Sequence, residues 1–353
     1  MKKLLSLFLC AMLLLAVASS ALAEGTYELA MITDNGNIDD QSFNQYSYEG
    51  LKLFAEKTGK TEAYYKPSED SNDARLEAIQ SAVDKGAKTI LTPGFLFAET
   101  IKEAQEKYPD VNFLFLDQDM GDEAKPNVHC VIYKEEQAGF LAGYAAVKDG
   151  YKKLGFLGGI AVPAVVRYGF GFVQGAELAA KEMNATDVSI KYWYSNSFVA
   201  NDEITTKMQG WVTEGTEVVF CAGGGIVFSA LKAAQEGSTK IIGVDVDQVG
   251  IDKDGRVITS AMKELSRSVV DSLDQLYAND GKWPEELAGK TSVLGAKENA
   301  IGLPTAEGSW KFNTFTVEEY KALLEKIAKD EVVVNNSIED KPEVTAVTVD
   351  YME

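Results

Sequence analysis

Short apolar runs of strand length recur along the whole chain, and stretches with helical periodicity separate them. The expected strands are 28–32, 89–91, 112–116, 128–132, 153–157, 188–194, 217–221, 240–244 and 257–259. The expected helices are 43–58, 72–85, 98–107, 137–148, 171–183, 201–214, 228–235, 265–277 and 317–329. Strands that alternate with helices of this length form right-handed βαβ units around a parallel sheet. Because the chain has 353 residues, the pattern predicts an α/β protein with two doubly wound parallel-sheet lobes rather than one very wide sheet.

Residues 1–23 have the pattern of a secretory signal peptide. Two lysines precede an apolar run over 4–17, and small residues ending at Ala23 follow it, which predicts cleavage near Glu24 and export. A transmembrane anchor is the alternative, but it needs about 20 apolar residues. Cys10 lies inside the apolar run without the small residues of a lipobox before it. We therefore expect a periplasmic or other extracytoplasmic location without a lipid anchor.

The charge of the chain limits its partners. Lys and Arg total 34 against 54 Asp and Glu, which gives a net charge of −20. Such a surface repels phosphate backbones and anionic lipid headgroups, so we expect no nucleic-acid partner.

Two cysteines follow the signal segment, Cys130 and Cys221, and each lies in its own strand-like run. We expect both to be buried thiols rather than a disulfide.

Polar and aromatic residues follow several of the expected strands. In open α/β sheets, ligands bind beyond the carboxyl ends of the strands. The residues at these positions include Asp34, Phe43, Asn44, Asp117, Phe198, the glycines 223–225, and Asp245. Each has a simpler interpretation as a helix cap, a turn or a core residue. Together they suit a neutral polar ligand with a flat face that aromatic rings can stack on.

The motifs of common catalytic sites are missing from the sequence. The sole histidine, His129, has no second histidine or cysteine at ligand spacing, which argues against a metal site or a Ser-His-Asp triad. No Lys-Ser/Thr pair follows the glycines 223–225, so they are not a nucleotide phosphate loop. We therefore expect no cofactor, no metal and no catalysis, and binding without chemistry is the leading class of function.

Several segments carry a family resemblance through their order and spacing. They read DNG at 34–36, DQSFN at 40–44, EQAGFLAG at 136–143, GFLGG at 155–159, GVDVDQ at 243–248 and TSAMK at 259–263. From Met31 to about Lys263, the chain resembles the basic membrane protein family. This is the PnrA-like, purine-nucleoside-binding group of substrate-binding proteins of ABC importers.

The resemblance implies a type I periplasmic-binding fold, in which three crossovers join two lobes around a ligand cleft. By analogy, the N-terminal lobe is 24–133 plus 257–290, and the C-terminal lobe is 134–256 plus 291–353.

The family pattern also implies roles for individual residues. Phe43 and Phe198 would stack on a base, and Asp34, Asn44 and Asp117 would face its polar edge. A backbone amide of Gly223, Gly224 or Gly225 would line the cleft, and Asp245 with Lys263 would hold the sugar. Three features depart from the family pattern and leave the choice of ligand open: Val199, Tyr168 with Gly171 in an expected loop, and the segment 225–228.

The function implied by the resemblance is that of a monomeric receptor. It would capture guanosine, inosine or adenosine and deliver the nucleoside to an ABC permease in the inner membrane. A receptor for a sugar or another small polar solute, a sensor domain with the same cleft, and a nucleoside hydrolase remain as alternatives.

Overall fold

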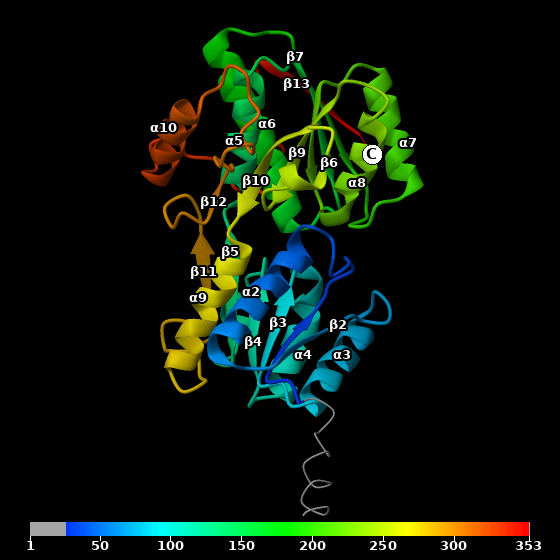
Figure 1. Ribbon diagram of the computed structural model, residues 1–353. Coiled ribbons are helices and arrows are strands. Elements are labelled where there is room, and N and C mark those ends of the chain that lie inside the picture. Colours follow the sequence, from blue (N-terminus) through cyan, green and yellow to red (C-terminus); the bar gives the residue numbers. More distant parts are fainter. Residues whose placement is uncertain (1–25, 353) are drawn as a thin grey trace, which may run out of the picture.

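The computed structural model describes residues 26–352, which form two α/β lobes stacked end to end (Figure 1). The first lobe contains a six-stranded sheet in the order β11-β5-β4-β3-β1-β2. The second contains a seven-stranded sheet in the order β12-β10-β9-β8-β6-β7-β13. The expected signal peptide over 1–23 lies outside the described residues. Within 26–352, no helix is both long and apolar enough to cross a membrane.

The first lobe is built mainly from the N-terminal part of the chain. All its neighbouring strands pair in parallel. Its elements are β1 (Leu29–Ile32), α2 (Phe43–Thr58), β2 (Glu62–Tyr65), α3 (Asn72–Asp84), β3 (Thr89–Pro93), η1 (Phe95–Phe97), α4 (Ala98–Lys107), β4 (Asn112–Leu116), η2 (Gly121–Glu123), β5 (Val128–Tyr133), α9 (Leu265–Ala278) and β11 (Lys290–Leu294).

The second lobe follows the same alternating pattern, and only β12 runs antiparallel to its neighbour. Its elements are α5 (Glu135–Lys148), β6 (Lys153–Gly158), α6 (Pro163–Met183), β7 (Val188–Tyr194), α7 (Asp202–Thr213), β8 (Val218–Ala222), η3 (Gly224–Ile226), α8 (Val227–Ala234), β9 (Lys240–Asp245), η4 (Val249–Ile251), β10 (Val257–Lys263), β12 (Ile301–Gly302), α10 (Val317–Ala328) and β13 (Val347–Tyr351).

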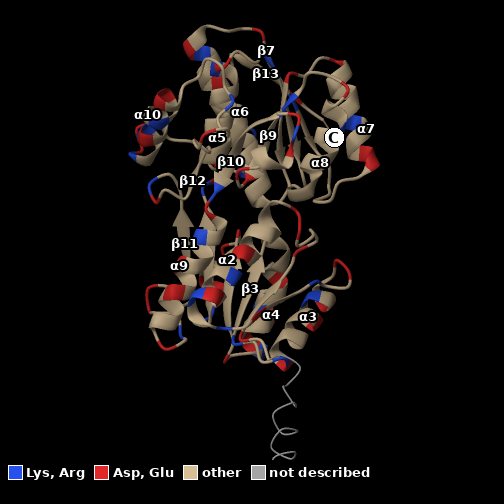
Figure 2. Cartoon of the chain, in the orientation of Figure 1, with Lys and Arg blue, Asp and Glu red and all other residues tan. Residues whose placement is uncertain are grey.

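Charged residues lie on the helices and loops at the outside of both lobes, whereas the central strands are almost free of them (Figure 2). Strands of a parallel sheet are covered on both faces and are therefore nearly continuous apolar runs. In β1, for example, all four residues are buried. This burial explains why the central strands could be predicted from apolar runs in the sequence.

The chain crosses between the lobes three times: after β5, after β10 and after β11. The structure differs here from the sequence-based division, which placed 257–290 in the first lobe and 291–353 in the second. β10 belongs to the second sheet because it pairs with β9, and β11 belongs to the first because it pairs with β5. Strand partners of this kind depend on tertiary contacts that an apolar run does not reveal.

Helices α5 and α6 pack with their backbones in contact. Four glycines lie at this contact: Gly139, Gly143, Gly171 and Gly175. A Cβ atom at Gly143 would lie 2.1 Å from the carbonyl oxygen of Phe172, and one at Gly175 would lie 1.9 Å from that of Phe140. A side chain at either position would therefore force the helices apart.

The prediction that helix α6 begins at residue 171 is wrong. The helix begins at Pro163, with proline in its first turn, where the missing N–H costs no hydrogen bond. Tyr168 therefore lies inside a helix and not in the expected loop, and Gly171, the expected first residue of the helix, lies in its interior. The glycines in this segment hide its helical pattern, although they serve the contact with α5.

We predict that Gly143→Ala lowers the free energy of unfolding by about 1–3 kcal/mol, because overpacking against a fixed backbone strains the core. Gly210→Ala is the matched control, since this exposed glycine of α7 has no atom within 4 Å of an added Cβ. The control should leave stability unchanged or raise it by up to about 1 kcal/mol. Denaturant unfolding measures both, and equal stabilities of the two variants would contradict the packing argument.

Candidate functional site

A cavity lies between the lobes, where strand ends of both sheets meet, and the interface between two lobes is a common place for a small-molecule site. Residues from both lobes line it. The structure brings all the sequence-predicted site residues to this cavity: Asp34, Phe43, Asn44, Asp117, Phe198, Gly223, Gly224, Asp245 and Lys263. That they bind a ligand remains a prediction.

Asp117 and Asp245 reach the cavity through an uncommon backbone conformation. Asp117 follows β4 with φ +60°, and Asp245 ends β9 with φ +65°. Only a few per cent of non-glycine residues adopt this left-handed region, and such residues cluster at functional sites. The two sheets therefore present one carboxylate each at equivalent strand ends.

The two predicted aromatic residues come from opposite lobes. Phe43 begins α2, and Phe198 lies in the loop after β7. Gly159 makes room for Phe198, since a Cβ there would lie 2.5 Å from its ring. Among the described residues, Phe43 and Phe198 make no ring contact with one another, while the Nζ of Lys263 lies 4.5 Å from the centre of the Phe43 ring. The aromatic rings thus line the cavity without filling it together.

Asp34 accepts hydrogen bonds on only one of its two carboxylate oxygens among the described residues. The amide Nδ2 of Asn44 donates to Oδ1 of Asp34 at 2.7 Å, and the N–H of Gly36 donates to the same oxygen at 2.6 Å. Burial raises the pKa of Asp34 to about 6, although the hydrogen bonds from Asn44 and Gly36 oppose this shift. Among the described residues, none donates a hydrogen bond to Oδ2 of Asp34.

Asn44 is itself fixed by its neighbours. Its Oδ1 accepts from the main-chain N–H of Asp34 at 3.1 Å, and its Nδ2 also donates to Oδ2 of Asp40 at 3.1 Å. Asp40 in turn accepts hydrogen bonds from the N–H groups of Ser42, Asn44 and Gln45 at the start of α2. The amide of Asn44 therefore positions Asp34 and has no hydrogen left for a ligand.

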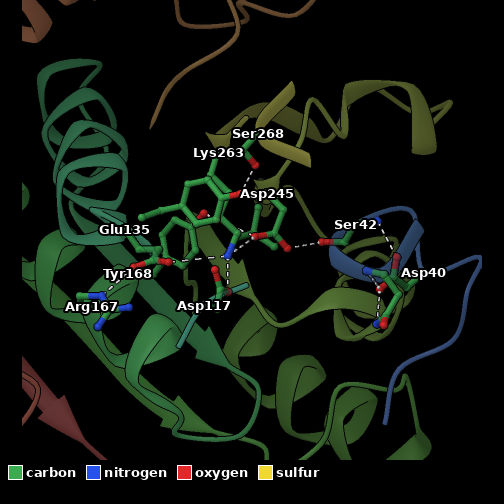
Figure 3. Close-up of polar contacts among 12 residues, drawn as sticks. Asp40, Ser42, Asp117, Glu135, Arg167, Tyr168, Asp245, Lys263 and Ser268 are labelled. Atoms are coloured by element: carbon green, nitrogen blue, oxygen red, sulfur yellow. Dashed lines mark hydrogen bonds and ion pairs between the residues drawn. The ribbon is translucent and has the colours of Figure 1, made fainter. Parts of the chain in front are cut away.

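Lys263 lies among three carboxylates (Figure 3). Its Nζ is 2.5 Å from Asp117, 3.5 Å from Asp245 and 3.7 Å from Glu135. Burial alone would lower the pKa of Lys263, but the three negative charges outweigh burial and raise it. Lys263 therefore keeps its proton and is a permanent cation in the site.

The acids around Lys263 are not fully satisfied. Burial raises the pKa of Asp117 to about 7 in spite of the attraction of Lys263. Oδ1 of Asp117 is buried and has no hydrogen-bond partner. Arg167 neutralises Glu135 through a 2.6 Å bond from Nε (Figure 3). Three carboxylates, Asp117, Asp245 and Glu135, thus lie beside two cationic side chains. The site is therefore rich in hydrogen-bond acceptors.

Sequence reasoning missed Glu135, Arg167 and Tyr168. Tyr168 lines the cavity, and its hydroxyl lies 3.4 Å from Asp245. Glu135 is completely buried at the start of α5, immediately after the first crossover. The only sequence signal for Glu135 was its position next to the 136–143 motif. A helical pattern does not show which residues of the helix face the cleft.

Hydrogen bonds join the two lobes directly across the cavity. The hydroxyl of Ser42 in the first lobe donates to Oδ2 of Asp245 in the second at 2.6 Å (Figure 3). The amide of Gln248 donates to the main-chain oxygen of Gln41 at 2.9 Å. The structure therefore describes a closed arrangement in which contacts between protein groups hold the lobes together.

Among residues 26–352, no group of three or more His, Cys, Asp and Glu side chains is arranged to hold a metal ion. Cys130 and Cys221 are buried free thiols. His129 is buried in β5, where its Nδ1 lies 3.0 Å from the main-chain oxygen of Lys290.

Two doubly wound lobes around a cavity at their strand ends define the class of type I periplasmic-binding proteins. A solved ABC transporter solute-binding protein from Aeropyrum pernix K1 has this fold, with a TM-score of 0.74 at 21% identity over 88% of this chain and 94% of that one. The predicted fold class is confirmed.

The family follows from the sequence. Residues 27–338 match the family described as ABC transporter substrate-binding protein PnrA-like, so the chain belongs to this family. It is 30% identical to Basic membrane protein A1 of Borrelia garinii subsp. bavariensis, over 94% of this chain and 95% of that protein. It is 29% identical to the ABC transporter nucleoside-binding protein BmpA of Lactococcus lactis subsp. cremoris, over 76% of this chain and 80% of that protein. The predicted family is confirmed.

We predict that Ser42→Ala opens the ligand-free protein. A hydrogen bond to a charged group contributes about 1.5–3 kcal/mol, so its loss should lower the ratio of closed to open molecules by roughly 10- to 100-fold. Small-angle scattering should then show a larger radius of gyration than in the parent protein. Ser238→Ala, at an exposed serine, is the control. An unchanged radius in Ser42→Ala would show that this bond does not hold the lobes together.

Proposed function

We propose that this protein is an extracytoplasmic receptor that captures a nucleoside, preferably a purine nucleoside, between its lobes and delivers it to an ABC permease. One observation carries the proposal. The cavity combines aromatic side chains from both lobes with carboxylate oxygens that have no donor, which suits a flat base attached to a hydroxylated sugar. The nucleoside-binding name of the Lactococcus lactis relative supports the same class of ligand.

The base would lie between Phe43 and Asp34. A Cβ built at Gly94 would touch both Cε1 of Phe43, at 3.4 Å, and Oδ2 of Asp34, at 3.6 Å. The aromatic ring and the open carboxylate oxygen therefore border the same space. Stacking on such rings contributes about 1–3 kcal/mol per base. Asn44 would act by holding Asp34 and not by contacting the base, which refines its sequence-based role.

The sugar would lie beside Lys263 and its carboxylates. Asp117 pairs with Lys263 there, so we place Asp117 with Asp245 at the ribose hydroxyls rather than at the base edge. The glycine turn of 223–225 would line the cleft. The N–H of Gly225 already donates to the carbonyl of Phe198 at 3.0 Å, so this turn also fixes the position of the aromatic loop.

The charge of the site argues against nucleotides. A phosphate would meet the carboxylates of Asp34, Asp117 and Asp245, and like charges in a buried site repel strongly. Nucleosides therefore fit better than nucleoside phosphates.

We further propose that residues 1–23 are a cleaved signal peptide and that the mature protein is a monomer in the periplasm without a lipid anchor. The permease would recognise the closed form, in which both lobes present one continuous surface.

We expect calorimetry on ligand-stripped protein to detect purine nucleosides with micromolar or tighter affinity and to recover them intact. Phe43→Ala should weaken binding at least about tenfold, because it removes one stacking surface. Phe228→Ala, at a partly exposed ring outside the cavity lining, should leave affinity unchanged. Binding of sugars alone would assign the protein to sugar transport, and release of free base would indicate a hydrolase.

We expect nucleoside binding to release protons near pH 6. The raised pKa of Asp34, about 6, means that roughly half of this carboxyl is protonated at that pH. A ligand that donates to the carboxylate stabilises its ionised form and lowers its pKa, so a proton leaves. Asp117, with a pKa near 7, should respond in the same direction. Calorimetry in buffers of different ionisation enthalpy measures this release, which should decline towards pH 8.5. Proton uptake at pH 6 would contradict the proposed contacts.

A further inference from the structure

One hydrogen bond between the lobes lies outside the ligand cavity. The side-chain amide of Gln248, which follows β9 in the second lobe, donates from Nε2 to the main-chain oxygen of Gln41 in the first lobe at 2.9 Å. Neither of these two residues lines the cavity. The bond from Ser42, by contrast, ends on Asp245, which does line it. The Gln41–Gln248 bond can therefore hold the lobes together whichever ligand lies between them.

The amide of Gln248 is held in one orientation. The residue is completely buried, and its Oε1 accepts from the N–H of Val244 at 2.9 Å. Its main-chain N–H donates to the hydroxyl of Ser260 at 3.0 Å, and Gly243 leaves room for it, since a Cβ there would lie 2.6 Å from Oε1. Turning the amide over would place nitrogen against the N–H of Val244 and oxygen against the carbonyl of Gln41. Both contacts would be repulsive, so the donor points to the first lobe.

The acceptor, Gln41, has an uncommon backbone conformation. Its φ is +55°, in the left-handed region that few non-glycine residues adopt. Its main-chain N–H and its Nε2 both donate to Oε1 of Gln45, at 3.1 and 2.8 Å. These bonds fix the turn before α2 and leave the carbonyl of Gln41 to Gln248. A backbone outlier that presents a carbonyl to the opposite lobe points to a functional contact.

We propose that Gln248 and the carbonyl of Gln41 form a latch that sets how long any ligand is retained, without touching the ligand. A ligand leaves only when the lobes open, so its dissociation rate follows the open fraction of the complex. Loosening the latch raises that fraction by the same factor for every ligand. Association is not slowed, because the open form admits the ligand. The inference rests on the proposed function for its ligands, but the contact itself does not.

The decisive variant is Gln248→Glu. One oxygen of the new carboxylate can still accept from the N–H of Val244, whereas the other faces the carbonyl of Gln41. Two acceptors repel each other, and burying the charge on closure is costly. At pH 8.5, labelled guanosine and adenosine should leave the variant at least about tenfold faster than the parent protein. The factor should be the same for both, and association should be no slower.

The matched control is Gln275→Glu, at an exposed glutamine of α9. It introduces the same charge away from the lobe contact and should release both nucleosides at the parental rate.

The pH dependence of Gln248→Glu distinguishes a latch from damage to the pocket. Once protonated, the new carboxyl has an O–H that can donate to Gln41 as the amide does. Closing the variant then takes up a proton, so the ratio of its release rate to the parental rate should fall from pH 8.5 to pH 5.5. Taking this ratio removes the titration of Asp34, which both proteins share. A variant with a damaged pocket would not recover at acid pH.

The first lobe offers a test that leaves Gln248 unchanged. Gln41→Gly and Gln41→Val remove the same side chain, but only glycine adopts the left-handed conformation at little cost. Gln41→Val should turn the carbonyl away from Gln248 and speed the release of both nucleosides. Gln41→Gly should release them at about the parental rate. Melting temperatures of the ligand-free variants establish that each is folded.

The outcomes separate the latch from the proposed function. If no nucleoside binds the parent protein, the proposed function fails, and small-angle scattering of the ligand-free proteins still tests the latch. Gln248→Glu should then have a larger radius of gyration than Gln275→Glu, and equal radii would overturn the latch. If nucleosides bind, parental release rates in Gln248→Glu, or faster release of one nucleoside alone, would overturn the latch while the receptor function stands.

Discussion

The buried ammonium of Lys263 is the interaction on which the site depends. An unpaired charge at this depth would cost several kcal/mol, and the carboxylates of Asp117, Asp245 and Glu135 offset that cost. Lys263 ends β10, where the chain leaves the second lobe, and Glu135 begins α5, where the chain has just entered it. The charges that shape the cavity therefore also tie together two of the three crossovers.

Under the proposed function, this arrangement would favour a ligand rich in hydrogen-bond donors. Lys263 and Arg167 already have acidic partners. Among the described residues, none donates to Oδ2 of Asp34, and the buried Oδ1 of Asp117 has no partner. A ligand that brings hydroxyl and N–H groups completes these hydrogen bonds, and an anion cannot. A preference for neutral solutes would follow from these hydrogen-bond donors and acceptors alone.

Much of this site could be predicted because each acid follows an apolar strand. Asp34, Asp117 and Asp245 stand where buried runs end, and parallel strands bring such positions together. Three features could not be predicted from the sequence in this way: the orientation of the Asn44 amide, the N-terminal part of α6 and the pairing of β10. They depend on hydrogen-bond directions and contacts between distant segments. Edge strands such as β2 and β13 were missed because half-exposed residues break the apolar pattern.

In the proposed function, Asp245 would link ligand capture to closure of the lobes. Its Oδ2 accepts from Ser42 of the opposite lobe, while its Oδ1 faces Tyr168 and Lys263 inside the cavity. One carboxylate thus takes part in both the contact between lobes and the lining of the cavity. A ligand that bonds to this carboxylate and also to Asp34 in the first lobe has more partners in the closed form than in the open form. By linkage such a ligand would shift the population toward closure, and the proposed permease would need only to distinguish these two forms.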